Sequence, residues 1–113
     1  MRTEKMIIDL NRFKTKGSKV FTGRDRGIKI RTESNINKTI EIEQDVLIKI
    51  PEDIMSINPS FLEEFLFNLV THYGATISKQ KIQFTSLNPR YDVTNDFEEA
   101  IDRILRRNNS LMK

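Results

Sequence analysis

The chain has 113 residues, of which 37% are hydrophobic and 31% charged, and it contains no cysteine. This length predicts a single domain with one hydrophobic core. The lack of cysteine excludes disulfides, thiolate nucleophiles and cysteine-based metal sites. No apolar run approaches the roughly 20 residues of a membrane-spanning helix, and the N-terminus lacks the apolar core of a signal peptide. We therefore expect one cytoplasmic domain over residues 1–113 that does not contact a membrane.

Charge is distributed unevenly along the chain. Residues 1–31 hold 10 Lys/Arg and 3 Asp/Glu, residues 32–102 hold 5 and 13, and residues 103–113 hold 4 and none. Such asymmetry indicates a charged partner, or basic ends that fold back on an acidic middle. Solvated basic edges on a soluble domain are the alternative interpretation.

The N-terminal third predicts a β-hairpin and then a basic helix. An apolar run at residues 6–10 that continues towards Phe13 predicts one strand, and residues 19–21 predict its partner across a polar turn. Thr22 is a candidate N-cap for a helix that runs to about Ser34. This helix has few apolar residues, so we expect it to lie on the surface, with Gly27 allowing a close approach to a neighbour.

The middle of the chain predicts two strands and a long helix. Residues 39–43 alternate between polar and apolar, and residues 46–50 are nearly continuously apolar, as in a central strand. Ser60 followed by Glu63 forms a capping box at the start of the helix. The helix has a broad buried stripe and is expected to end at Gly74; its apolar residues lie at positions 61, 62, 65, 66, 69, 70 and 73.

The C-terminal part predicts a strand, a turn and a last helix. Residues 81–85 alternate and predict a strand, and Asn95 with Glu98 forms a second capping box. We expect the tail at residues 108–113 to be frayed. The buried stripe of this helix consists of Phe97, Ala100, Ile101, Ile104 and Leu105.

These elements predict an α/β fold with a small mixed sheet of about four strands and about three helices. The strand–helix–strand unit from 46 to 85 implies a right-handed crossover between parallel strands. The N-terminal hairpin would add the antiparallel component.

Three segments together resemble a known family. They are the run Phe21-Thr22-Gly23-Arg24-Asp25-Arg26-Gly27, the strand at 46–50, and Ile57-Asn58-Pro59-Ser60-Phe61 with Glu64 and Leu69. This pattern resembles the STAS-like domains of bacteria and their phages, named for their similarity to sulfate transporter and anti-sigma factor antagonist domains. The resemblance covers about residues 6–105. It implies a small sheet with helices mainly on one face, and a protein that acts by binding a partner.

The resemblance also singles out Ser60. In the anti-sigma factor antagonists, a serine at the start of the helix after the central strand is phosphorylated by a partner kinase with an ATP-binding fold, and Ser60 lies in the similar place. Two positions depart from the family pattern. The antagonists usually carry Asp-Ser-Ser-Gly where this chain has Asn58-Pro59-Ser60-Phe61, and the family often has an acidic residue late in the central strand, where this chain has Lys49.

The residues themselves leave two interpretations open for each candidate site. Ser60 is a phosphoacceptor or only a helix cap. Arg24 and Arg26 bind a phosphate, an acidic partner or nucleic acid, or they are solvated. His72, the only histidine, is expected at a boundary position rather than in a metal site, and the paired acids Glu52 and Asp53 are expected to be solvated.

The leading hypothesis is a non-catalytic regulatory domain that binds a protein, with an ATP-binding kinase-like regulator as a candidate partner. The alternative is a nucleic-acid- or nucleotide-binding accessory protein that uses the basic helix. An enzyme is disfavoured, because no catalytic constellation is evident, and no metal or cofactor is expected. The expected partner-binding residues are Arg24, Arg26, Lys29, Arg31, Asn58 and Ser60.

Overall fold

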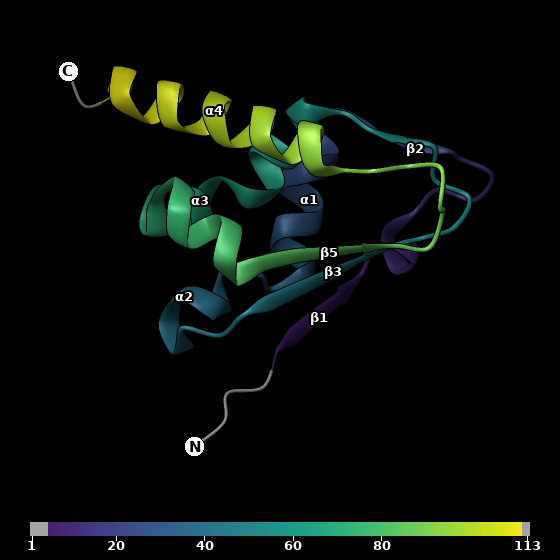
Figure 1. Cartoon of the computed structure of the whole chain (residues 1–113), viewed down its shortest axis with the longest axis horizontal. Coiled ribbons are helices and arrows are strands. Elements are labelled where there is room, and N and C mark those ends of the chain that lie inside the picture. Colours follow the sequence, from purple (N-terminus) through teal and green to yellow (C-terminus); the bar gives the residue numbers. More distant parts are fainter. Residues whose placement is uncertain (1–4, 112–113) are drawn as a thin grey trace.

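Three parallel strands form the main sheet of the computed structural model, which describes residues 5–111 (Figure 1). They are β1 (Met6–Asp9), β3 (Val46–Ile50) and β5 (Ile82–Ser86), in the order β1-β3-β5. Ile48 in the middle of β3 pairs with Ile8 on one side and with Phe84 on the other. The central strand and the strand after the long helix are therefore confirmed, as is their parallel pairing.

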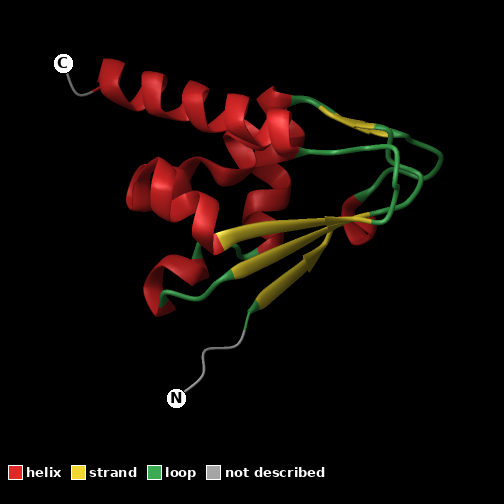
Figure 2. Ribbon diagram, in the orientation of Figure 1, coloured by secondary structure: helices red, strands yellow, loops and turns green. Residues whose placement is uncertain are grey.

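Helices cover one face of this sheet (Figure 2). On β3 the side chains of Val46, Ile48 and Ile50 are buried, whereas those of Leu47 and Lys49 are only half-buried. This alternation is expected when one face of a sheet packs against helices and the other faces solvent. The helices are α1 (Arg24–Ser34), α2 (Lys38–Ile42), α3 (Pro59–Lys81) and α4 (Thr94–Leu111). Helix α3 packs between α1 and α4.

The predicted N-terminal hairpin is wrong. After β1 the chain turns into a 3-10 helix, η1 (Leu10–Phe13), whose start is capped when the Asp9 carboxylate accepts from the Asn11 amide. The next strand, β2 (Val20–Phe21), pairs in parallel with β4 (Ser56–Ile57), and not with β1. The structure therefore has two parallel sheets, of three and two strands, in place of one mixed sheet of four.

Residues 38–42 form the short helix α2, so the strand predicted at 39–43 is also wrong. Residues in the left-handed conformation bound this helix on both sides, Asn35 at φ 60° and Glu43 at φ 53°. The Glu43 amide donates back to the carbonyl of Thr39, which closes the helix. Two isoleucines spaced two apart in so short a segment fit a strand or a single helical turn equally well.

Helix α1 meets α3 at Gly27. A β-carbon at this position would lie 2.5 Å from the Phe61 carbonyl oxygen, a distance that requires the helices to separate. The expected close approach at Gly27 is thus confirmed, although Gly23 and not Thr22 occupies the N-cap position. On α3, Gly74 leaves the helical conformation at φ 81°, as expected, but a second helical segment continues to Lys81.

Helix α4 differs from its predicted bounds at both ends. The Asp92 carboxylate accepts from the Thr94 amide at 2.9 Å, so the helix starts at Thr94 and the capping box at Asn95 and Glu98 is wrong. The helix continues to Leu111 and so extends into the segment from residue 108 for which we expect fraying. Residues 112–113 lie outside the described residues.

The predicted buried stripes of α3 and α4 form the core between the helices and the sheet. Phe61, Phe65, Leu66 and Val70 are completely buried. From α4, Phe97, Ala100, Ile101 and Ile104 are buried, and Leu105 is partly buried. Both stripes are therefore confirmed.

Replacing Phe65 with alanine should lower the free energy of unfolding by about 3–5 kcal/mol, because the side chain is fully buried and packs against Phe61. Denaturant unfolding measures the change. Ile77→Ala on the same helix is the control, since Ile77 is 40% exposed. A loss below about 1 kcal/mol at Phe65 would contradict the packing described above.

Candidate functional site

Asn58, and not Ser60, caps helix α3. Asn58 has extended backbone angles, and its side-chain oxygen accepts from the Ser60 amide at 2.8 Å. Pro59 takes the first helical position, where its missing N–H costs nothing and its fixed φ suits the helix. The capping box predicted for Ser60 and Glu63 is therefore wrong, because Asn58 and Pro59 together place the helix start two residues earlier.

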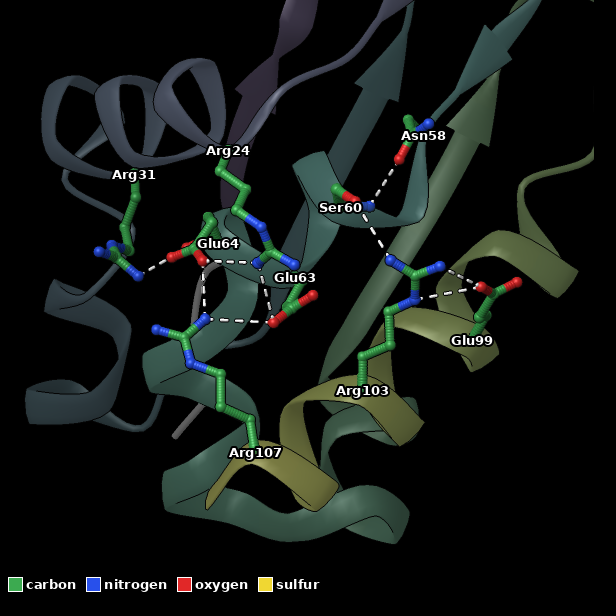
Figure 3. A network of polar contacts seen from close by, with 9 residues as sticks. All are labelled: Arg24, Arg31, Asn58, Ser60, Glu63, Glu64, Glu99, Arg103 and Arg107. Atoms are coloured by element: carbon green, nitrogen blue, oxygen red, sulfur yellow. Dashed lines mark hydrogen bonds and ion pairs between the residues drawn. The ribbon is translucent and has the colours of Figure 1, made fainter. Parts of the chain in front are cut away.

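The Ser60 hydroxyl lies against a guanidinium group of helix α4. Arg103 Nη1 donates to Ser60 Oγ at 3.1 Å, and the same guanidinium donates to Glu99 Oε2 through Nε at 3.1 Å and Nη2 at 2.7 Å (Figure 3). Glu99 thereby holds Arg103 in a fixed orientation beside the hydroxyl. A negative group on Ser60 would lie next to a positive side chain that is already in place.

Backbone amides, by contrast, are not available to an anion at this helix start. Ser60 N–H donates to the Asn58 side chain, and Phe61 N–H donates to the Asn58 carbonyl at 3.0 Å. Leu62 N–H donates to the same carbonyl at 3.3 Å. Any phosphate on Ser60 would depend on Arg103 and not on free amides.

Two adjacent acids of α3 form a buried ionic cluster with arginines from both flanking helices. The side chains of Glu63 and Glu64 are only 4% and 6% exposed. Arg24 of α1 lies 3.0 Å from both carboxylates, and Arg107 of α4 lies 3.1 Å from Glu63 and 2.7 Å from Glu64. Figure 3 shows the two guanidinium groups bridging the two acids. Two positive and two negative charges balance within the cluster.

This cluster shifts the pKa of Glu63 downward. Burial opposes ionisation of the carboxyl group, but hydrogen bonds from Arg24 and Arg107 outweigh burial, so the pKa lies below its ordinary value. The same hydrogen bonds raise the pKa of both arginines. The repulsion between a phosphate on Ser60 and these acids is reduced, because each carboxylate already has two cations beside it.

Most of the basic helix is engaged within the molecule. Besides Arg24, Arg31 donates to the Glu64 carbonyl at 2.6 Å. Arg26 donates to the Phe13 carbonyl and to Thr15 Oγ1 at 2.9 and 2.6 Å. Lys29 is exposed and makes no hydrogen bond or ion pair with another described residue. Arg24 and Arg26 are therefore not simply solvated, because both make contacts that join α1 to other parts of the fold.

Apolar side chains are exposed next to the start of α3. Met55 is 54% exposed and Val20 is 43% exposed. The backbones of the two segments are neighbours, because the Met55 amide donates to the Lys19 carbonyl at 2.7 Å and Val20 pairs with Ser56. We call Val20, Met55, Asn58 and Ser60 the α3-entrance surface. It combines an apolar part with the exposed cap and the half-buried serine.

The other candidate residues do not gather into a site. His72 is exposed and stacks edge-on against Tyr73, and Glu52 is exposed. Asp53 pairs with Lys14 at 2.8 Å. Within residues 5–111, no group of three or more His, Cys, Asp or Glu side chains is placed to hold a metal ion.

Arg103 and Arg107 are the important residues that the sequence interpretation missed. Neither residue is among the partner-binding residues expected from the sequence. Glu63 and Glu64 indicate that pairing cations exist elsewhere in the chain. They lie inside an otherwise apolar stretch, and buried acids are almost always paired. Arg103 and Arg107 stand one helical turn apart on α4, so a single face of that helix was a possible source of the pairing cations.

Comparison with protein-family models, with curated proteins and with solved structures finds no match to this chain. Among the described helices, none is both long and apolar enough to cross a membrane.

Replacing Arg24 with alanine should destabilise the fold by about 1–3 kcal/mol at pH 7. The loss is smaller than for a fully buried pair, because Arg24 is 51% exposed and Arg107 remains. Since the folded-state pKa of Glu63 is lowered, this ionic contribution is present above the ordinary glutamate pKa and disappears as pH falls through the folded value. The difference between variant and wild type should therefore shrink below about pH 4.

Urea unfolding from pH 7 down to pH 3 measures both effects. Lys29→Ala is the matched control on the same helix and should change stability by less than about 0.5 kcal/mol at every pH. Equal stability of Arg24→Ala and wild type at pH 7 would show that the cluster does not hold α1 in place.

Proposed function

We propose that this protein is a non-catalytic regulatory domain of the STAS-like type, which binds a protein partner through the α3-entrance surface. The proposal rests on the resemblance of its segments to anti-sigma factor antagonist domains and on one structural observation. Val20 and Met55 expose apolar side chains on the β2–β4 segment that leads into Asn58 and Ser60, and Ser60 is the residue that the resemblance singles out. Exposed apolar side chains rimmed by polar ones are typical of protein-binding surfaces.

Met55→Glu should abolish partner binding without unfolding the domain, because the side chain is exposed and a charge at the centre of an apolar contact is strongly unfavourable. The tagged chain is cross-linked in its native host, and bound proteins are identified by mass spectrometry. Ile42→Glu on α2 is the control, since Ile42 is 51% exposed and lies outside the α3-entrance surface. The proposal fails if Met55→Glu and Ile42→Glu capture the same proteins as wild type.

We further propose that phosphorylation of Ser60 regulates this binding. The hydroxyl is half-buried, and Arg103 beside it would pair with the phosphate. A phosphoserine carries more charge than a carboxylate and is a strong acceptor, so it competes with Glu99 for the guanidinium. A partner kinase with an ATP-binding fold is the candidate modifying enzyme, on the basis of the resemblance alone.

Ser60→Asp should preserve the helix and weaken partner binding by about tenfold or more, because it adds negative charge to the α3-entrance surface. The cap is unaffected, since Asn58 supplies it. Ser60→Asn is the control of equal shape without the charge. Circular dichroism checks helicity, and affinity is measured with the partner identified above. Equal affinities of the Asp and Asn variants, together with no phosphate on Ser60 in protein from the native host, would remove the switch.

Nucleic-acid or nucleotide binding by α1 stays the alternative prediction. Of its four basic residues only Lys29 is without a polar contact among the described residues, so the helix offers less free charge than its sequence suggests. A salt-dependent gel shift with single- and double-stranded DNA that is weakened by Lys29→Ala would favour this alternative.

A further inference from the structure

The outer edge of β5 is an unpaired sheet edge. Among the described strands β5 pairs only with β3, and the Leu87 amide donates to the Ile50 carbonyl. Backbone N–H and C=O groups of residues two apart on a strand point to the same side. The backbone groups of Thr85 and Gln83 therefore also face β3, whereas those of Phe84 and Ser86 point outward. No hydrogen bond within the described chain uses these outward backbone groups.

A groove of about 380 Å³ runs beside this edge, between β5 and the start of α4. Ile82, Phe84, Val93 and Phe97 supply its apolar lining. The rings of Phe84 and Phe97 meet edge-on at 5.0 Å and join the strand to the helix. The lining residues of β5 are those on its helix-covered face, so a strand added at this edge would place alternate side chains in the groove.

We propose that β5 and this groove bind an extended segment of a partner protein as an added strand. Exposed Asp92 and Glu98 line the groove, against the single base Lys79, so the segment is expected to carry a basic residue beside alternating apolar ones. This site is separate from the α3-entrance surface, and the inference does not depend on the proposed function.

An extended segment suits this edge better than a second folded copy of this chain. In Figure 1 helix α4 lies on the same side of β3 as β5, and residues 91–98 line the groove that flanks the β5 edge. If two β5 edges paired in antiparallel orientation, both helix layers would lie on the same face of the joined sheet, and the 91–98 segments that flank the two edges would be brought together. A bare extended segment brings neither a helix layer nor a second 91–98 segment to this edge.

The test selects peptides from a phage-displayed library of random dodecapeptides against the intact protein. Selected peptides should alternate apolar residues and include lysine or arginine. Glu98→Lys should weaken their binding by about five- to tenfold, through loss and reversal of charge at the groove. Asp102→Lys makes the same charge change one turn further along α4, outside the groove, and should leave affinity within about twofold.

Amide hydrogen exchange locates the bound peptide. The Phe84 and Ser86 amides should exchange freely in the unbound protein and become protected on binding, whereas the Leu87 amide is already bonded to Ile50 and should change little. In an added strand, every second peptide amide faces β5 and the others face away. N-methylation of the set that faces β5 should abolish binding. Failure to select any alternating peptide, unchanged exchange at Phe84 and Ser86, or full affinity of both methylated peptides would each overturn the proposal.

Discussion

Two adjacent carboxylates in the first turns of α3 determine where its neighbouring helices lie. Glu63 and Glu64 are almost completely buried, and an unpaired buried charge is highly unfavourable. Arg24 must approach from α1 and Arg107 from α4 for both acids to be neutralised, and Arg31 adds a hydrogen bond to the α3 backbone. The apolar stripes bring the helices together, and this cluster selects one arrangement of them.

Local sequence patterns predicted the parts of the fold that local forces determine. The apolar strand at 46–50, the alternating strand near 82–86 and the buried face of α3 follow from side-chain spacing alone. The close approach at Gly27 was also predictable locally, because a glycine in a surface helix indicates close packing. The pairing of β1 with β3 was not predictable in this way. Their partners, such as Ile8 and Ile48, are 40 positions apart, and no turn joins them.

The predicted starts of α3 and α4 were wrong because several nearby residues can cap each helix. Ser60 and Asn95 each satisfy a capping-box pattern, yet Asn58 and Asp92 provide the caps that form. Which residue caps the helix depends on where tertiary packing places the first buried residue of the helix. The chemical environment of Ser60 was not predictable from the local sequence for the same reason, because Arg103 comes from a helix 43 positions away along the chain.

Tyr91 connects the groove beside β5 to strand β4, which precedes the cap of α3. Its hydroxyl accepts from the Ile57 amide of β4 at 3.1 Å and donates to Asp96 of α4 at 2.7 Å. Burial, together with the hydrogen bond to Asp96, raises the pKa of Tyr91 above its ordinary value, so the hydroxyl keeps its proton and continues to donate. Tyr91 also lines the groove beside β5, whereas Ile57 adjoins the cap of α3. A segment that displaced Tyr91 from the groove would break its hydrogen bond to β4, the strand that directly precedes the cap of α3.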